Sequence, residues 1–273
     1  MTTKKKNDKT KIIGILNLTQ DSFSDGGKYI DITNAIDYVK KMINAGVDII
    51  DIGAESTRPG FKSISPDQQL EKILPVLNEI KNNCKPVSIS IDTRSSLVAK
   101  EALNAGAVII NDVSSGTYDS KMMQTISKFN ATIIFTHMPE SHQSNKPNLR
   151  LSKTLEDIQN YFHERIKDAI ACGVKKENII IDPGICYGKT GKENIEIIKN
   201  IQFFVKGFKN VCLGVSNKKF SSRLFKNFND SELNIVSLAV TTHCVINNVS
   251  HLRVHDVIAN KDALEVAWKT HTI

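Results

Sequence analysis

The chain has 273 residues, a formal net charge of +7 and apolar segments spread evenly along its length, which fits a single globular domain. No apolar segment reaches the roughly 20 residues needed to cross a bilayer, and the five cysteines are widely spaced without a C-x-x-C pair. These features exclude a membrane protein, a disulfide framework and a zinc site, and they predict a cytoplasmic protein.

The positive charge favours anionic partners, but its distribution argues against nucleic acid. The lysines are scattered over the predicted helices, and no cluster combines basic with aromatic residues. We therefore expect a phosphate-bearing small molecule as the partner. Residues 1–10 are polar and rich in lysine, without a hydrophobic stretch of the secretory kind, and are expected to form a disordered basic tail.

Eight short runs of Ile and Val recur along residues 11–273, and each run stops at a polar or charged residue. Between the runs, apolar residues return at the spacing of an amphipathic helix. Helical connections of this length bring the chain back to the same end of a sheet, as parallel strands require. Eight such units predict an α/β protein with a single (β/α)8 TIM barrel. The strands are expected near residues 12–16, 49–51, 87–91, 108–110, 132–135, 179–182, 211–215 and 251–254.

The helical segments alternate with these strands. The first covers residues 32–43 and stops at Gly46, a typical helix end. The segment 192–205 is predicted to be one continuous helix, and residues 139–150, with two prolines and no apolar period, are predicted to be a loop at the barrel rim. The helices are expected near residues 32–43, 66–77, 97–103, 120–129, 153–172, 192–205 and 231–247, with a last helix ending near 268.

Polar residues at the strand ends should share one pocket, because the carboxyl ends of barrel strands converge. Asp92, Asn111 and Asp182 supply acceptors and an amide, which suit a flat heterocycle rich in N–H groups. Each residue also has a simpler explanation. Asp92 alone could cap a helix, as could Asp51, and Asn17 could close a turn.

Positive charge reaches the same rim and favours a phosphate ligand. Arg58, Lys218, Arg253 and His255 all lie at or just beyond strand ends. Arg253 and His255 are two residues apart on one strand, so their side chains face the same way, and arginine can bind phosphate in a bidentate manner. The simpler alternative is that Arg253 pairs with Asp256 or with a helix end.

Residues 182–190 resemble a P-loop in position, since a strand enters the segment and a helix leaves it. A P-loop needs four residues between its glycines, whereas Gly184 and Gly188 enclose three, and Pro183 stands where glycine is required. The segment therefore argues against a nucleotide triphosphatase.

Four segments resemble dihydropteroate synthase, of the pterin-binding family, and the resemblance runs from residue 14 to residue 257. The order and the spacing of the segments agree with that family as well. The segments are GILNLTQDSFSDGG at 14–27, DIGAESTRPG at 51–60, DPGICYGK at 182–189 and RVHDV at 253–257.

The resemblance implies a transferase of folate biosynthesis on a (β/α)8 barrel. Its reaction would condense 6-hydroxymethyl-7,8-dihydropterin diphosphate with p-aminobenzoate and release pyrophosphate. The resemblance also implies Mg²⁺ carried largely by the substrate, sulfonamide inhibition and a homodimer.

By the same resemblance, the rim residues take separate roles. The pterin would contact Asp92, Asn111, Asp182 and Lys218, and the diphosphate would contact Thr57, Arg58, Arg253 and His255. The p-aminobenzoate pocket would be formed by Phe23, Pro59, Tyr187, Ser216 and Lys219. Asn17 would coordinate Mg²⁺. The residues implied to act in catalysis are Asp25, Phe23, Arg58, Lys218, Arg253 and His255.

Three departures from the family pattern keep other functions open. Gln20 stands where proline is usual, Asn217 where arginine is usual, and the Gly-x-Pro that usually follows Met138 is missing. A catalytically silent pterin-binding paralogue is therefore one alternative. The others are a pterin-dependent methyltransferase domain, which would have no diphosphate for Arg253 to bind, and a Schiff-base aldolase that uses Lys218.

Overall fold

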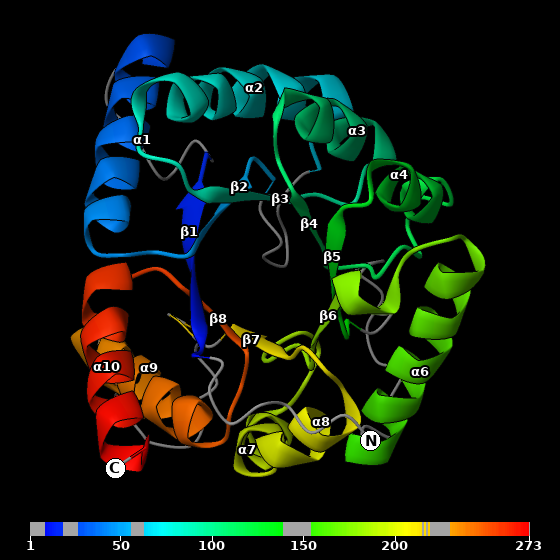
Figure 1. Ribbon diagram of the computed structural model, residues 1–273, viewed down its shortest axis with the longest axis vertical. Coiled ribbons are helices and arrows are strands. Elements are labelled where there is room, and N and C mark those ends of the chain that lie inside the picture. The colour runs from blue at the N-terminus through cyan, green and yellow to red at the C-terminus, as the bar shows by residue number, and fades with distance from the viewer. Residues whose placement is uncertain are drawn as a thin grey trace.

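A closed ring of parallel strands, surrounded by helices, forms the centre of the protein (Figure 1). The computed structural model describes residues 9–18, 27–55, 63–138, 154–214, 216, 218 and 230–272. The eight strands lie in the order β6-β5-β4-β3-β2-β1-β8-β7, and every neighbouring pair is parallel. The predicted (β/α)8 barrel is confirmed. The strands are β1 (Lys11–Asn17), β2 (Ile49–Gly53), β3 (Ser88–Asp92), β4 (Ile109–Asp112), β5 (Thr132–Thr136), β6 (Ile179–Asp182), β7 (Cys212–Gly214) and β8 (His251–Val254).

The ring closes between β6 and β7 through a short contact. Ile181 of β6 pairs with Val211, directly before β7, in a single parallel bridge. The backbone N–H of Ile181 donates to the Asn210 carbonyl at 3.1 Å. The other strand pairs have three or more residue pairs in register, so this junction is the shortest in the ring.

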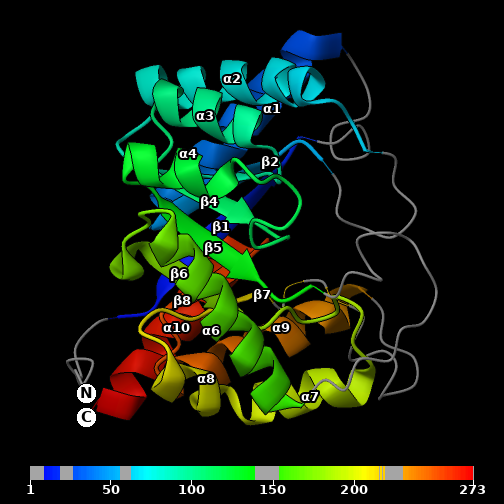
Figure 2. The same cartoon turned by 90° about the vertical axis from the view of Figure 1, so that its right-hand side faces the viewer.

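The helices cover the outside of the ring (Figure 2). Their starts follow local capping chemistry. Ser65 and Thr154 each form a capping box with the side chain three residues later, and Thr190 does the same with Glu193. The helices are α1 (Gly27–Asn44), α2 (Pro66–Asn83), α3 (Ser96–Ala105), α4 (Met122–Phe129), α6 (Leu155–Ala171), α7 (Gly191–Lys199), α8 (Ile201–Gly207), α9 (Asp230–Ile246) and α10 (Val257–Thr272), with a short 3-10 turn at Lys176–Asn178.

The prediction of one helix over 192–205 was wrong. The segment forms α7 and α8, which are separated at Asn200. The Asn200 side-chain amide donates to the Glu196 carbonyl at 3.0 Å and to the Glu196 carboxylate at 2.7 Å. Asparagine competes in this way for backbone groups that a continuing helix would use, so it favours a break.

The interior of the barrel follows the two-residue repeat of its strands. Near the amino ends of the strands, five isoleucines and a cysteine fill the axis. Two residues further along a strand the side chain faces the same way, so Ile49 is followed inside the barrel by Asp51, Ile109 by Asn111 and Ile180 by Asp182. The cluster contains Ile13, Ile49, Ile109, Ile134, Ile180 and Cys212.

The last residues of the expected basic tail pack against the barrel. Thr10 is buried and its hydroxyl donates to the Val249 carbonyl at 2.8 Å, while Lys9 pairs with Glu265. Residues 1–8 and the expected rim loop 139–150 lie outside the described residues. Among the described helices, none has both the length and the apolar character needed to cross a membrane.

Candidate active site

An arginine held between two carboxylates lies at the centre of the carboxyl-end rim. Arg253, on β8, donates from Nε to Asp51 Oδ2 at 2.6 Å and from Nη2 to Asp92 Oδ2 at 2.8 Å. Asn111, on β4, donates from Nδ2 to the same Asp51 oxygen at 3.0 Å. Three of these four residues come from strand ends far apart in the sequence, and Asp51 lies two residues before the end of β2. Two of the simpler explanations do not hold. Helices α2 and α3 are capped by Ser65 and Ser95 rather than by Asp51 or Asp92, and the described ion-pair partners of Arg253 do not include Asp256.

A second part of the rim brings Asp182 and Lys218 next to Arg253. A methyl group placed on Gly214 would lie 3.7 Å from Asp182 Oδ2, 3.7 Å from Lys218 Nζ and 3.8 Å from Arg253 Cβ. The three residues therefore surround one point at the end of β7. The sequence-based expectation that Asp182 and Arg253 lie at one pocket agrees with this geometry.

Several polar atoms of the rim remain available to a ligand. Asp182 Oδ1 accepts from the Gly184 backbone N–H at 2.8 Å, and Asp182 Oδ2 accepts from none of the described residues. The same holds for Asp92 Oδ1 and Asn111 Oδ1 within the described part of the chain, and Arg253 Nη1 donates to none of these residues. Among the described residues, the unpartnered groups at the rim thus include three acceptor oxygens and the two N–H groups of Arg253 Nη1, with the Lys218 ammonium beside them. Such a set suits a heterocycle with several N–H groups.

Burial shifts the titration of these groups. Burial raises the pKa of Asp92 to about 7, with Arg253 acting in the opposite direction and Asp51 adding to the rise. Burial likewise raises the pKa of Asp182, while Lys218 lowers it. The pKa of Lys218 is lowered by burial and raised in turn by Asp182. Opposed shifts of this kind are typical of functional sites.

His255 and Ser216 form a further pair at this rim. The Nδ1 atom of His255 lies 3.1 Å from Ser216 Oγ, and the His255 backbone N–H donates to the same hydroxyl at 3.2 Å. The Tyr38 hydroxyl donates to the His255 carbonyl at 2.6 Å. These contacts hold His255, which directly follows β8, at the rim beside Arg253.

The segment after β6 is built around a buried lysine. Lys189 Nζ donates to the carbonyls of Gly184 at 2.8 Å, His137 at 3.0 Å and Tyr187 at 3.4 Å. Gly184 has a φ of +76° and its Cα faces the His137 carbonyl so closely that a Cβ would clash. Lys189 therefore holds the loop together, unlike the phosphate-binding lysine of a P-loop.

Lys218 is fixed from this same loop. Its Nζ atom donates to the Ile185 carbonyl at 2.8 Å and lies 4.9 Å from the centre of the Tyr187 ring. Tyr187 is thereby placed beside Lys218 and the end of β7. That Tyr187 borders the p-aminobenzoate pocket stays a prediction.

Several expected site residues fall in segments that the structure leaves undescribed. Of the residues that it describes, Asn17, Asp92, Asn111, Asp182, Tyr187, Ser216, Lys218, Arg253 and His255 belong to the rim or to the loops beside it. The residues outside the described ranges are Phe23, Asp25, Thr57, Arg58, Pro59 and Lys219, together with Gln20 and Asn217.

Sequence reasoning placed Asp51 at a strand end on the shared rim and weighed it against a helix cap, but it assigned this residue no role in the site. Asp51 is fully buried and bonds both Arg253 and Asn111. The two-residue repeat is the signal that could have found it, because Asp51 shares its strand face with Ile49 and Gly53. A charged residue on an otherwise buried strand face requires a partner of opposite charge.

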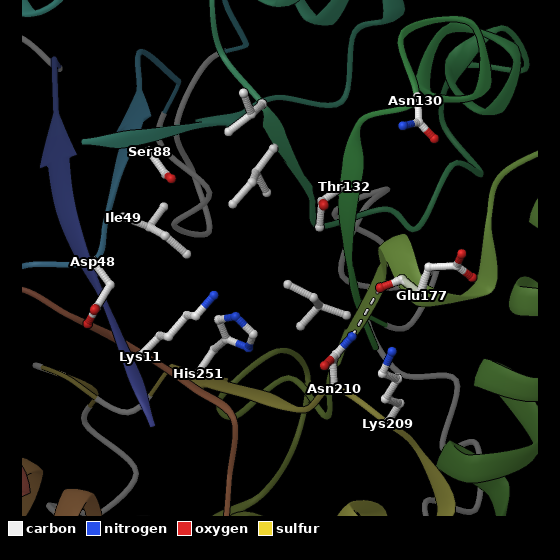
Figure 3. Close-up of a pocket in the computed structure, with 13 residues that line it drawn as sticks. Lys11, Asp48, Ile49, Ser88, Asn130, Thr132, Glu177, Lys209, Asn210 and His251 are labelled. Carbon is white, nitrogen blue, oxygen red and sulfur yellow. Dashed lines mark hydrogen bonds between the residues drawn. The ribbon is translucent and has the colours of Figure 1, made fainter. Parts of the chain in front are cut away.

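A pocket of about 600 Å³ lies at the opposite mouth of the barrel, where the strands begin (Figure 3). Ile49, Ile109 and Ile180 contribute to its lining. Lys11 and His251 lie side by side at this mouth, across from Lys209. Active sites of such barrels lie at the carboxyl ends of the strands. This pocket is therefore separate from the candidate active site.

The described part of the rim supplies few metal ligands of its own. No cluster of three His, Cys, Asp or Glu side chains suited to a metal occurs among the described residues. Asn17, at the end of β1, has its amide oxygen 3.8 Å from the point where a Cβ on Gly53 would lie, and Asp92 Cβ is 3.3 Å from that point. A single amide oxygen beside carboxylates fits a hard cation that arrives with most of its other ligands.

The described chain matches a known family over most of its length. The family model for pterin binding enzymes covers residues 13–255. Dihydropteroate synthase from Clostridium beijerinckii is 38% identical over 260 residues, which span 95% of this chain and 93% of the relative. The Bacillus subtilis enzyme of the same name is 39% identical over 217 residues, which span 80% of this chain and 73% of the relative.

Solved structures agree with the sequence relatives. The crystal structure of dihydropteroate synthase from Clostridium difficile in the presence of pteroic acid has a TM-score of 0.89 at 34% identity, and the match covers 98% of this chain and 99% of that chain. Dihydropteroate synthase from Xanthomonas albilineans in complex with 7,8-dihydropteroate has a TM-score of 0.85 at 26% identity, covering 97% and 95%. The rim geometry and these matches together show that the chain belongs to the dihydropteroate synthase family of pterin-binding enzymes.

Proposed function

We propose that this protein condenses 6-hydroxymethyl-7,8-dihydropterin diphosphate with p-aminobenzoate, giving 7,8-dihydropteroate and pyrophosphate. The observation that carries the proposal is the meeting of Asp182, Lys218 and Arg253 around one point at the end of β7. Acceptors for a flat ring and donors for an anionic tail are thereby side by side. The solved structure of the Xanthomonas albilineans relative is a complex with 7,8-dihydropteroate, which supports the choice of substrate.

The pterin would be read by the free acceptors of the rim. Asp182 Oδ2 would accept from the amino and ring N–H edge, and Asp92 and Asn111 would read the other edge. Lys218, which already donates to the Ile185 carbonyl, would donate a second hydrogen bond to the pterin carbonyl or a ring nitrogen. A buried acceptor left without its partner costs free energy, so a ring that lacks these N–H groups would be rejected.

The diphosphate would lie beside Arg253 and His255. Asp51 and Asp92 take two of the five N–H groups of Arg253, so both N–H groups of Nη1 and the second N–H of Nη2 are left for phosphate. His255 adds a ring nitrogen whose position is set by Ser216. Together these groups would stabilise the negative charge that develops on the leaving pyrophosphate.

Asn17 would hold Mg²⁺ that arrives with the diphosphate. When bound, this ion neutralises charge on the leaving group. The residues of the first two rim loops, Phe23 and Asp25 with Thr57, Arg58 and Pro59, would complete the p-aminobenzoate side and exclude water. Lys219 and Ser216 would face the carboxylate of that substrate.

The chemistry of the two substrates suggests the order in which bonds break and form. The C–O bond to the diphosphate breaks, the pterin ring delocalises the resulting positive charge, and the neutral amine of p-aminobenzoate attacks the exocyclic carbon and then loses a proton. Water would compete for the same carbon, so closure of the site matters. No strong base is required, because the arylamine is already neutral near pH 7.

The test is pyrophosphate release by purified protein supplied with both substrates and Mg²⁺. We expect release that depends on p-aminobenzoate, with formation of 7,8-dihydropteroate detected by chromatography. Binding of the pterin without any release of pyrophosphate would instead identify a catalytically silent pterin-binding protein, the alternative suggested by Gln20 and Asn217.

We also propose that the protein is a homodimer through α9 and α10. Ile235 is 66% exposed on α9, and Ile258 and Val266 are 58% and 63% exposed on α10. These helices lie next to each other on the barrel (Figure 1). Exposed apolar side chains on two neighbouring helices are a feature expected of a subunit interface. Light scattering after gel filtration tests the proposal, and Val266→Lys should shift the mass from dimer to monomer.

A cytoplasmic location completes the proposal. All five cysteines are free thiols, and Cys212 and Cys244 are buried in the barrel. Reduced, buried thiols fit a reducing compartment. Fractionation of cells with an antibody against the protein would test this.

A further inference from the structure

Asp51 occupies the middle of the rim network, and it belongs to neither of the substrate-contacting sets proposed above. It lies on the inner face of β2 and is 0% exposed. Its Oδ2 atom accepts both from Arg253 Nε at 2.6 Å and from Asn111 Nδ2 at 3.0 Å. One carboxylate oxygen therefore connects a residue proposed for the diphosphate with a residue proposed for the pterin.

The stability of the barrel does not account for this carboxylate. Asp51 Oδ1 is buried and has no hydrogen-bond partner among the described residues, and the same is true of the hydroxyl of Ser90, its neighbour in register on β3. Burying a charge with one oxygen unpaired costs free energy. Hydrophobic residues in such a position are often neutral or stabilising compared with an ion pair.

Asp51 also determines which atom of Asn111 faces the ligand. An ionised carboxylate only accepts, so the amide nitrogen of Asn111 must face Asp51. The amide oxygen, Oδ1, is then the atom left for a substrate N–H group. On the other side, the Nε bond to Asp51 and the Nη2 bond to Asp92 fix the plane of the Arg253 guanidinium and leave Nη1 free.

We infer that Asp51 is a positioning residue, which holds the Arg253 guanidinium and the Asn111 amide in the orientations that substrate binding needs. The inference deepens the proposed function and rests on it. Asp51 itself touches no substrate in this scheme. Its effect passes through Oδ2, by way of two hydrogen bonds to residues on β8 and β4.

Two double-mutant cycles test the inference. The first combines Asp51→Ala with Asn111→Ala and measures the Kd of 6-hydroxymethylpterin by calorimetry. The second combines Asp51→Ala with Arg253→Lys and measures kcat/KM for pyrophosphate release. We expect Asp51→Ala alone to cost about tenfold or more in each assay, and much less in a background that already lacks its partner, since residues that share hydrogen bonds couple strongly.

The conservative variant Asp51→Asn provides rescue. An asparagine oxygen in the place of Oδ2 can accept both hydrogen bonds, so Asp51→Asn should bind the pterin within about threefold of the wild type. This variant also guards against misfolding of Asp51→Ala, and thermal unfolding of every variant shows whether it is folded. Equal loss for Asn and Ala would overturn the inference, as would additive costs in both cycles.

Asp112→Asn is the matched control. Asp112 is also fully buried on the rim side of the barrel, but its oxygens accept from Ser114 and Gly116. Its effect should add to those of Asn111→Ala and Arg253→Lys without coupling. A wild-type protein that binds the pterin but releases no pyrophosphate would refute the proposed function alone, because the calorimetric cycle would still test the role of Asp51.

Discussion

The two mouths of the barrel use the same eight strands in opposite ways. At the mouth where the strands begin, isoleucines fill the axis, and charged residues lie at the edge, as Asp48 does with its half-buried partner Lys261. At the other mouth, Arg253 is in direct contact with two carboxylates, of which Asp51 is fully buried and Asp92 is 12% exposed. The first arrangement stabilises the fold with apolar contacts, while the second places charge where only a ligand or a partner side chain can satisfy it.

The comparison explains why the pocket at the amino ends of the strands is not the active site. The pocket of about 600 Å³ has an isoleucine base with lysines at its edge, and those lysines can remain hydrated. The rim at the opposite end instead holds groups whose titration is shifted by burial, such as Asp92 and Lys218. Shifted pKa values and convergent polar atoms identify a functional site better than volume does.

The largest expected difference between the mouths concerns ligand binding. Asp182→Ala removes the free oxygen Oδ2 at the rim, and we expect the Kd for 6-hydroxymethylpterin to rise by about a hundredfold or more. Asp48→Ala, at the other mouth, should leave that Kd unchanged. Calorimetry on both variants makes the comparison. An equal rise in Kd for the two variants would contradict binding of the pterin at the carboxyl-end rim.

A second difference concerns stability. Arg253→Ala leaves Asp51 and Asp92 unpaired in the barrel interior, and we expect a loss of about 3–5 kcal/mol in the free energy of unfolding. Lys261→Ala breaks the ion pair with Asp48, which is partly exposed, and should cost at most about 1 kcal/mol. Urea denaturation measures both. Similar losses would show that the two ion pairs are equally solvated.

Apolar packing at the first mouth can be tested apart from chemistry. Ile49 is 4% exposed and belongs to the isoleucine cluster. Ile49→Val should cost about 0.5–1.5 kcal/mol in the free energy of unfolding and leave kcat/KM for pyrophosphate release unchanged. A fall in turnover without a fall in stability would contradict the division between the two ends.

A last expected difference is a pH dependence of stability that arises at the rim. Burial raises the pKa of Asp92 to about 7 in the folded protein, so the folded state holds this proton more tightly than the unfolded state. The resulting stability is fully present below about pH 4, and it is lost as the pH rises through 7. Asp92→Asn should therefore flatten the decline of unfolding free energy between pH 4 and 8, measured by urea denaturation without ligands. An unchanged slope would assign the decline to other groups.

The ring of strands could be predicted from the sequence because the pattern that marks each strand is local. Each run of Ile and Val with a polar residue at its end is visible without knowledge of the rest of the chain, and the parallel order follows from the helices between runs. The convergence of Asp182 with Arg253 follows from barrel geometry alone. These two residues are therefore predictable from their places at strand ends.

The pairings inside the rim were not predictable in the same way. Arg253 bonds Asp51 and Asp92, although Asp256 is its neighbour in sequence, because barrel closure brings β8 next to β1 and close to β2 and β3. The break at Asn200 was missed because the apolar pattern continues across it, through Ile197, Ile198 and Ile201. Side-chain competition for a carbonyl is a contact that periodicity does not contain.

The short junction between β6 and β7 implies that ligand binding stabilises the barrel itself. Asp182 follows the bridged Ile181 on one side of the seam, and Gly214, with Lys218 beyond it, lies on the other side. A ligand that contacts both strands connects them at the junction that has the fewest paired residues. Bound substrate should therefore slow hydrogen exchange at the Ile181 amide more than at the amides between β1 and β2. The substrate would then stabilise the closure of the barrel.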